Sequence, residues 1–434
     1  MQRNISWPRF LAARLLTFAE IGLKLCLFLP ILLFMVWFNY KVDVSGLFQG
    51  ELAPRQVATL LLEGNTVSGY DQMDERQVLE VYAQNLPEGL DTLALGSSRV
   101  LQLSGDLVGG GSFFNAGISG AGPMDIMNIW YLFEREDKLP NTLILEVDAW
   151  LFNPDPDINR NSDSELFAEF LEKGLGIDAD YEEPDTVALW KALVDPAYFQ
   201  GNVTYYLKQQ QTGAVLTEDG DDIPFKAVTG SIENLDYAVK RSDGSVQYPL
   251  GFRSWNYDQV MAEVLAQAGT LSALHGFDQM DPYWTDLFTR FIEHVQQKGV
   301  NVVFLMTPYH PFIALHVYNN PEGFTGFFEV EPWVREFAAM NGISVYGSYH
   351  AGRVGIQESM FFDGLHCKPE ALRLMFPGVE KALAGEQTPY QQLYLETYGG
   401  AENSANALIG YDAGCVVVDA DWLAQAEAAM LGLT

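Results

Sequence analysis

Short apolar runs alternate with amphipathic segments over most of the chain. Five of these runs, each bounded by Gly, Pro, Asn or Asp, predict buried β-strands: Thr92–Leu95, Ser112–Phe114, Thr142–Val147, Val300–Met306 and Ile343–Tyr346. Apolar positions at helical spacing predict helices over residues 124–136, 282–298, 331–340 and 369–384. This alternation predicts an α/β fold in which helices cover both faces of a parallel sheet. Ligands of such folds bind at the carboxyl ends of the strands.

The longest apolar run lies near the N-terminus. Residues 15–38 are almost all apolar, and a helix of this length reaches about 36 Å, enough to cross a hydrocarbon core of about 30 Å. Arg3, Arg9 and Arg14 precede the run, so the positive-inside rule predicts a cytoplasmic N-terminus and an exported remainder. A cleaved signal peptide is the alternative, but no small-residue cleavage site follows Phe38. We therefore expect residues 1–41 to form a cytoplasmic stub and an uncleaved transmembrane anchor.

The rest of the chain divides by its pattern. Residues 42–151 and 281–386 carry the strand and helix alternation and predict two halves of one α/β domain. Residues 152–280 are polar, acidic and rich in turn residues, which indicates an insertion or cap over the sheet. Residues 387–434 form a C-terminal extension.

Composition excludes some functions. The 434 residues include 57 Asp and Glu against 25 Lys and Arg, a formal net charge of −32. This charge argues against a nucleic-acid partner, which needs a basic surface, although an acidic excess by itself also serves solubility. The histidines and carboxylates show no convincing metal-ligand spacing, so neither a metal nor another cofactor is expected. Cys367 and Cys415 could form a disulfide or remain two free thiols.

Gly96-Ser97-Ser98-Arg99 directly follows the first predicted strand. A serine at such a turn projects its hydroxyl at the carboxyl edge of the sheet, where backbone N–H groups can stabilise an oxyanion. An ordinary helix cap is the alternative, because serine is a favoured cap residue.

Asp363-Gly364-Leu365-His366 precedes the last predicted helix. A carboxylate three residues before a histidine can orient its imidazole, although a simple Asp turn would have the same sequence. Together the two motifs provide a nucleophile, a base and an orienting carboxylate in a chain order that known triads use. Ser98, Asp363 and His366 are therefore the candidate catalytic residues.

These motifs resemble blocks of the SGNH/GDSL hydrolase superfamily. Ser98 matches the nucleophile of the first block, Phe114–Gly120 resembles the second, and Asp363–His366 resembles the last. The resemblance implies a three-layer, flavodoxin-like parallel sheet and an oxyanion hole made by the N–H groups of Ser98 and Gly120, with Gly117 as the alternative. Asn115, in the second block, is a candidate for contacting the substrate.

The third block departs from the superfamily pattern. Asp148-Ala149-Trp150 stands where an Asn normally donates to the oxyanion, and a carboxylate cannot donate unless it is protonated. Asn153 or Trp150 could supply the missing donor, while Asp148 and Trp150 remain candidates for substrate binding.

Three further residues are candidates for substrate contact. Tyr309 and His310 follow the fourth predicted strand in a Pro-bounded turn, which could equally be a rigid structural turn. Arg99 could pair with an anionic substrate group or only with a neighbouring Asp.

An N-terminal anchor together with these motifs most resembles exported envelope proteins of the DltD and alginate-acetylation type. The resemblance implies an extracytoplasmic, membrane-anchored serine esterase or O-acyltransferase acting on acyl esters of envelope or exported polysaccharide, sometimes beside a membrane-bound O-acyltransferase. The alternative is a non-catalytic binding or assembly subunit with the same fold.

Overall fold

The computed structural model describes most of the chain up to Met375. The described residues are 24, 28–43, 48, 52–70, 74–108, 111–159, 161–179, 190–212, 214–215, 223–224, 226–271, 273–274, 276–319, 323–354 and 356–375. The chain forms two compact units: residues 1–55 with 182–224, and residues 56–181 with 225–434. The structure thus divides the predicted insertion 152–280 between two units, and the predicted extension 387–434 lies outside the described residues.

The first unit joins the end of the N-terminal apolar run to part of the predicted insertion. Residues 28–42 are helical, and helix α7 (Pro196–Thr212) packs against them, with the rings of Phe38 and Phe199 5.5 Å apart. The Asn202 amide donates to Asn39 Oδ1 at 3.0 Å, and strands β5 (Ala214–Val215) and β6 (Ile223–Pro224) form a short antiparallel pair.

The predicted membrane span is only partly described. Residues 15–23 and 25–27 lie outside the described residues, while Phe28, Ile31 and Trp37 expose 66%, 65% and 55% of their surface. Among the helices that the structure describes, none combines the length and the apolar character that crossing a membrane requires.

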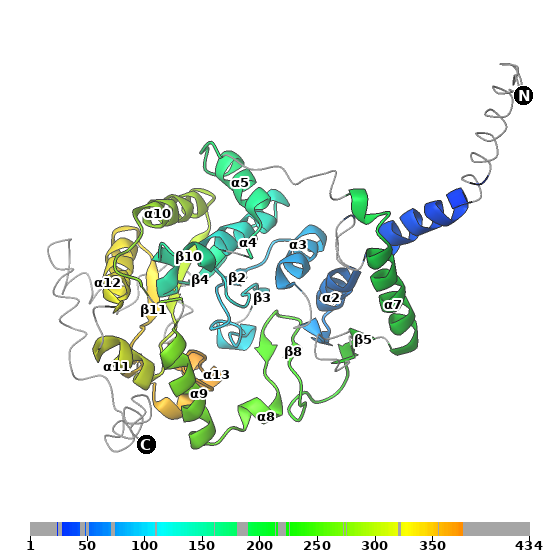
Figure 1. Cartoon of the computed structure of the whole chain (residues 1–434). Helices are drawn as coiled ribbons and strands as arrows, with labels where there is room; N and C mark the ends of the chain where they lie inside the picture. The colour runs from blue at the N-terminus through cyan, green and yellow to red at the C-terminus, as the bar shows by residue number, and fades with distance from the viewer. Residues whose placement is uncertain are drawn as a thin grey trace, which may run out of the picture. The chain divides into compact units, whose positions relative to one another are not determined.

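The second unit is built on a five-stranded parallel sheet (Figure 1). Its order is β11-β10-β4-β2-β3, so the chain adds β3 on one side of β2 and the remaining strands on the other. The strands are β2 (Thr92–Leu95), β3 (Phe113–Asn115), β4 (Thr142–Glu146), β10 (Asn301–Met306) and β11 (Ser344–Gly347). These agree with the five predicted strands to within one residue at each end, and the α/β fold class is confirmed at this level.

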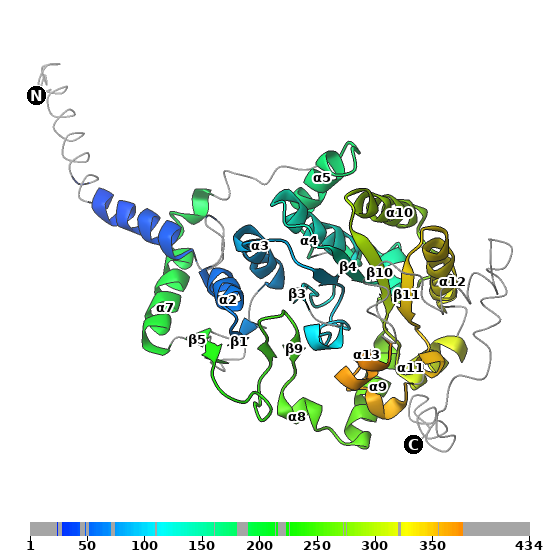
Figure 2. The ribbon, with the colours of Figure 1, turned by 180° about the vertical axis from the view of Figure 1, so that it is seen from behind.

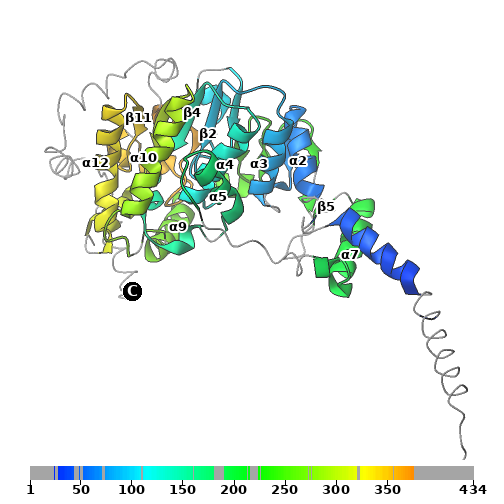
Figure 3. The ribbon, with the colours of Figure 1, turned by 90° about the horizontal axis from the view of Figure 1, so that it is seen from above.

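Alternate side chains of the strands pack into two separate cores. Leu93, Leu95, Leu143 and Phe304 point to one face, which helices α4 (Pro123–Arg135), α10 (Pro282–Gln297) and α12 (Thr325–Met340) cover (Figure 3). Ala94, Ile144 and Val303 point to the other face, where α13 (Pro369–Met375) packs (Figure 2). Burial on both faces explains why these strands are continuously apolar in sequence.

Two predicted helices differ in extent. Helix α12 begins six residues before the predicted start at 331, because Phe327 and Val330 continue the buried stripe and Pro332 is accommodated inside the helix. Helix α13 starts at the predicted residue and is described to Met375, so residues 376–384 of that prediction lie outside the described part.

A second sheet, which the sequence patterns did not predict, combines one strand from residues 42–151 with three strands from the predicted insertion. Strands β7 (Ala227–Val228), β1 (Thr66–Ser68), β8 (Val239–Lys240) and β9 (Val246–Gln247) form it in that order, all antiparallel. The turn between β8 and β9 carries Asp243-Gly244, a sequence typical of hairpins, and Gly244 adopts a φ of 78°. Asn115 donates from its backbone N–H to the Asp243 carbonyl at 2.8 Å, so this hairpin packs beside the end of β3.

Six further α-helices have bounds within the described residues. They are α2 (Leu52–Leu62), α3 (Glu75–Asn85), α5 (Ser164–Lys173), α8 (Leu250–Arg253), α9 (Tyr257–Thr270) and α11 (Pro311–Asn319).

Candidate active site

The turn after β2 sets the direction of two neighbouring serine side chains. The backbone N–H and the hydroxyl of Ser97 donate to Glu146 Oε2 at 2.8 and 3.1 Å, which holds Ser97 inside the protein. A Cβ at Gly96 would lie 2.5 Å from Glu146, so only glycine fits there. The next residue, Ser98, is half-buried and faces a cavity.

The structure brings Ser98, His366 and Asp363 together. Ser98 Oγ lies 2.8 Å from His366 Nε2, and His366 Nδ1 lies 2.8 Å from Asp363 Oδ2, although Ser98 and His366 are 268 positions apart. Asp363 Oδ1 also accepts the backbone N–H groups of Leu365 and His366, each at 2.8 Å. This is the connectivity of a nucleophile, a base and an orienting carboxylate.

Asp363 is strongly held in its ionised form. Burial by itself raises its pKa, but the charge and hydrogen bond of His366 and the two backbone N–H groups outweigh burial and lower the pKa to about 2. The carboxylate therefore remains an acceptor at Nδ1, which leaves Nε2 as the ring nitrogen that faces Ser98.

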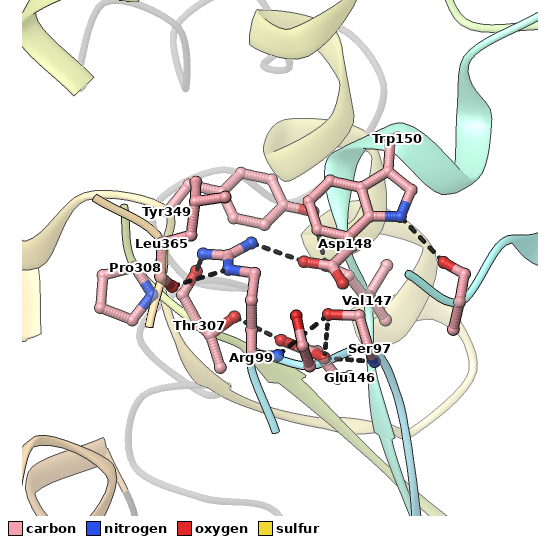
Figure 4. A network of polar contacts seen from close by, with 12 residues as sticks. Ser97, Arg99, Glu146, Val147, Asp148, Trp150, Thr307, Pro308, Tyr349 and Leu365 are labelled. Atoms are coloured by element: carbon pink, nitrogen blue, oxygen red, sulfur yellow. Dashed lines mark hydrogen bonds and ion pairs between the residues drawn. The ribbon is translucent and has the colours of Figure 1, made fainter. Parts of the chain in front are cut away.

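The side chain of Arg99 connects the nucleophile turn to the histidine loop (Figure 4). It is 1% exposed, pairs with Asp148 Oδ1 at 2.5 Å and donates to the carbonyl oxygens of Thr307 and Leu365 at 2.5 and 3.2 Å. The guanidinium carbon also lies 4.0 Å from the centre of the Tyr309 ring. Arg99 thus joins the loops that follow β2, β4 and β10 to the residue before His366.

Two buried carboxyl groups, those of Glu146 and Asp148, lie near this single guanidinium. Burial, followed by the charge of Asp148, raises the pKa of Glu146, and burial also raises the pKa of Asp148 against the opposing charge of Arg99. Asp148 contacts Arg99 directly, whereas Glu146 Oε2 accepts hydrogen bonds from Ser97 and Glu146 Oε1 lies 2.5 Å from the hydroxyl oxygen of Thr307, which can accept a hydrogen bond from a neutral carboxyl group. We therefore assign the ionised form to Asp148 and the proton to Glu146, since one cation balances only one of two buried charges.

Ser98 opens into a cavity of about 390 Å³. Gly120, Trp150 and Leu365 line it together with four residues of the predicted insertion, Asp155, Asp157, Ile158 and Asn161. Neither the Ser98 nor the Gly120 backbone N–H donates to any other residue within the described part of the chain. These two groups are therefore the available donors for an oxyanion. The Gly117 N–H is already taken by Asn115 Oδ1 at 2.9 Å, which removes the alternative donor.

The loop that carries Gly120 is tied to helix α3. Glu75 Oε2 accepts the backbone N–H of Ser119 at 2.7 Å, and the buried ammonium of Lys240 lies 4.0 Å from Glu75 Oε1. This chain of contacts fixes the residue immediately before the candidate oxyanion donor.

Five predicted substrate-contacting residues have other roles in the structure, and these predictions are corrected. Arg99 and Asp148 are occupied with each other, and Asn115 is fully buried, donating to the carbonyl oxygens of Val100 and Leu103. His310 is fully buried, and burial lowers its pKa to about 3. Tyr309 is 1% exposed beside the guanidinium of Arg99 and borders a smaller cavity of about 110 Å³.

The two proposed replacements for the missing Asn donor do not point their donors into the cavity. Trp150 Nε1 donates to the Ala121 carbonyl at 3.0 Å, and the Asn153 amide donates to the Ala273 carbonyl at 2.9 Å. Trp150 nevertheless lines both the cavity at Ser98 and the smaller one.

Sequence reasoning missed four residues that hold the site. Glu75 and Glu146 anchor backbone N–H groups, Gln267 Oε1 accepts the Gly364 N–H at 2.8 Å, and the Tyr248 ring lies 6.1 Å from that of His366. Only Glu146 carried a signal, as a charged residue that ends an otherwise apolar strand.

Within the described residues, no group of three or more His, Cys, Asp or Glu side chains could hold a metal ion. Cys367 is a buried free thiol, and Cys415 lies outside the described residues.

Comparison with known proteins adds no family assignment. No model of a known protein family matches the chain, and a search of curated proteins finds no significantly similar sequence.

Proposed function

We propose that the protein is a membrane-anchored, extracytoplasmic serine esterase or O-acyltransferase that resembles the SGNH hydrolases. The observation that carries this proposal is the pair of 2.8 Å contacts linking Ser98 Oγ, His366 and Asp363 at the rim of a cavity. Enzymes that transfer acyl groups use this arrangement, in which a hydroxyl is hydrogen-bonded to an imidazole and a carboxylate orients that imidazole.

The reaction follows from these contacts. His366 Nε2 accepts the proton of Ser98 as the Ser98 oxygen attacks the carbonyl carbon of an ester. Asp363 stabilises the imidazolium, and the N–H groups of Ser98 and Gly120 donate to the oxyanion. The imidazolium then gives its proton to the departing alcohol, which leaves an acyl group on Ser98. Water or a sugar hydroxyl transfers its own proton to His366 as its oxygen takes the acyl group, and His366 returns that proton to the Ser98 oxygen, which restores the free serine.

The strand order supports the family resemblance. Numbered along the chain, the five parallel strands have the order 2-1-3-4-5, which is the flavodoxin-like order. Ser98 follows β2, on one side of the point where the order reverses, and Asp148 follows β4 on the other. Ligands of doubly wound folds bind at this point.

The cellular setting is part of the same proposal. The apolar run at 15–38 and the preceding arginines support a single-pass anchor with a cytoplasmic N-terminus. The substrate would be an acylated envelope or exported polysaccharide, with a membrane-bound O-acyltransferase as a candidate partner.

Hydrolysis of p-nitrophenyl acetate tests the activity. The full chain, purified in detergent, should hydrolyse this ester, and His366→Ala should lower kcat by at least about 10³-fold. A matched control is His316→Ala, because the His316 ring packs against that of Phe324, with 6.3 Å between the ring centres. Equal, near-zero rates for the native chain and His366→Ala would instead favour the alternative of a binding or assembly subunit.

A further inference from the structure

An apolar cavity of about 110 Å³ lies beside the cavity at Ser98. The two cavities share three wall residues, which are Trp150, Ala273 and Leu365. The end of α9 and the residues after it supply most of the remaining wall of the apolar cavity, which consists of Gln267, Thr270, Leu271, Leu274 and Tyr309. We propose that the apolar cavity receives the acyl chain of the ester, a saturated chain with about four carbon atoms beyond the carbonyl, an inference that rests on the proposed function.

The two cavities differ in the side chains that line them. Carboxylates and an amide border the cavity at Ser98, from Asp155, Asp157 and Asn161. Among the described residues that line the apolar cavity none is charged, and Leu271 and Leu274 are 8% and 2% exposed. An ester carries its alcohol and its acyl chain on opposite sides of the carbonyl carbon. The polar cavity therefore suits a hydroxyl-bearing alcohol, and the apolar cavity suits a hydrocarbon chain.

The polar side chains of the apolar cavity offer a ligand no hydrogen bond. Trp150 Nε1 and the Thr270 hydroxyl donate to backbone carbonyl oxygens at 3.0 and 3.2 Å. Gln267 Oε1 accepts a backbone N–H at 2.8 Å, and its Nε2 donates to a carboxylate at 3.2 Å. The Tyr309 hydroxyl bonds no described residue, but it is buried, so a ligand does not reach it. Removal of apolar surface from water is therefore the driving force that this wall provides.

The size of the apolar cavity limits the length of the chain. An apolar protein cavity of about 150 Å³ holds benzene, which has six carbon atoms. In proportion, a cavity of about 110 Å³ holds about four carbon atoms. An acetyl group leaves most of this space unfilled, and an octanoyl chain exceeds it. Each buried methylene group should raise kcat/KM about fourfold until the space is filled.

Hydrolysis of p-nitrophenyl esters of graded chain length tests this inference. The full-length protein in detergent is assayed with the acetate, butyrate, valerate, hexanoate and octanoate esters. We expect kcat/KM to rise at least about tenfold from acetate to butyrate, because two more methylene groups are buried. The highest value should fall between butyrate and hexanoate, and octanoate should be a poorer substrate.

Two variants of the cavity wall should move this optimum in opposite directions. Leu271→Ala enlarges the apolar cavity and should make hexanoate or octanoate the best substrate. Leu274→Phe fills the space and should make acetate the best substrate. A loss of folding lowers the rates for all esters together and does not shift the optimum. The control is Leu287→Ala, a buried leucine of α10 outside both cavity linings, which should keep the native optimum.

Binding to the full-length Ser98→Ala protein tests the cavity without any need for turnover. The probe is methyl 4,4,4-trifluorobutyrate, followed by fluorine NMR in the same detergent. The probe should bind saturably, and methyl butyrate should displace it at a concentration at which methyl acetate does not. Introducing Leu274→Phe into the Ser98→Ala protein should abolish this binding, while Leu287→Ala should leave it unchanged.

Several results would overturn the inference. They are a highest kcat/KM for acetate in the native chain, an unshifted optimum in both folded wall variants, and the absence of saturable probe binding to Ser98→Ala. The enzyme proposal fails separately: if the native chain hydrolyses no ester while the probe binds as described, the cavity remains an acyl-chain site and the catalytic assignment is rejected.

Discussion

The guanidinium of Arg99 donates a hydrogen bond to the carbonyl oxygen of Leu365 at 3.2 Å. Arg99 follows the candidate nucleophile directly, and Leu365 directly precedes the candidate base. The contact therefore ties together the two backbone segments whose side chains meet as Ser98 and His366. Asp148 holds the guanidinium from the other side, which explains why a carboxylate occupies the position where an Asn donor was expected.

Arg99 should act as a positioning residue. Arg99→Met leaves Asp148 buried without a partner and should cost about 3–5 kcal/mol of stability, measured by denaturant unfolding. The double variant Arg99→Met, Asp148→Leu removes both charges and should recover most of that stability. Its kcat for p-nitrophenyl acetate should stay at least about tenfold low, because the link to Leu365 is still missing. A double variant with native stability and native kcat would show that Arg99 does not position the triad.

The proton assigned to Glu146 should make stability fall as pH rises. The folded-state pKa is raised above the ordinary value, so between these two pKa values the folded state holds a proton that the unfolded state has released. This contribution to the free energy of unfolding is complete below the ordinary glutamate pKa, and it is lost as the pH rises through the raised pKa. Glu146→Gln keeps the neutral form and should remove this loss.

Thermal unfolding between pH 5 and pH 9 checks this assignment. The native chain and Glu146→Gln should unfold at similar temperatures at the acid end, and the variant should be the more stable one at the alkaline end. If the unfolding temperatures of the two proteins change with pH in parallel, the proton is not on Glu146. Glu88→Gln, an exposed residue before β2, serves as the control and should follow the native curve.

Asp363 should orient the imidazole rather than exchange protons. Its pKa of about 2 keeps it ionised throughout the neutral range, so its titration should not shape the pH dependence of kcat above about pH 4. Asp363→Asn replaces the acceptor at Nδ1 and should lower kcat by about 10³–10⁴-fold while the protein remains folded. A loss of less than tenfold in steady-state hydrolysis would contradict an orienting role.

Glu75 should hold the loop of the oxyanion donor. Glu75→Ala removes the acceptor of the Ser119 N–H and should lower kcat by about tenfold, with a smaller change in KM. Glu75→Gln keeps an acceptor oxygen and should retain more of kcat, although the buried Lys240 loses its nearest carboxylate and the variant should unfold at a lower temperature. Equal kcat in both variants and the native chain would show that Glu75 does not hold the loop of the oxyanion donor.

Local patterns predicted the sheet and the triad because their signals lie within a few residues. The strands are apolar on both faces, so each run stands out, and Asp363 reaches His366 within one turn of the chain. The roles of Arg99 and Glu146 depend on partners 49 to 266 positions away, and no local pattern encodes such pairings. Burial separates a structural arginine from a substrate-binding one, and the sequence of Arg99 and its neighbours is compatible with both. The hairpin at Asp243-Gly244 was detectable, but its strands have only two residues each.

Covalent labelling shows whether Ser98 is the nucleophile. The full-length protein is treated with a fluorophosphonate, and the modified peptide is identified by mass spectrometry. We expect one adduct, on the peptide that carries Ser98, formed at a rate that drops sharply in His366→Ala and absent in Ser98→Ala. An adduct that persists in Ser98→Ala, or labelling that His366→Ala leaves at the native rate, would contradict this expectation.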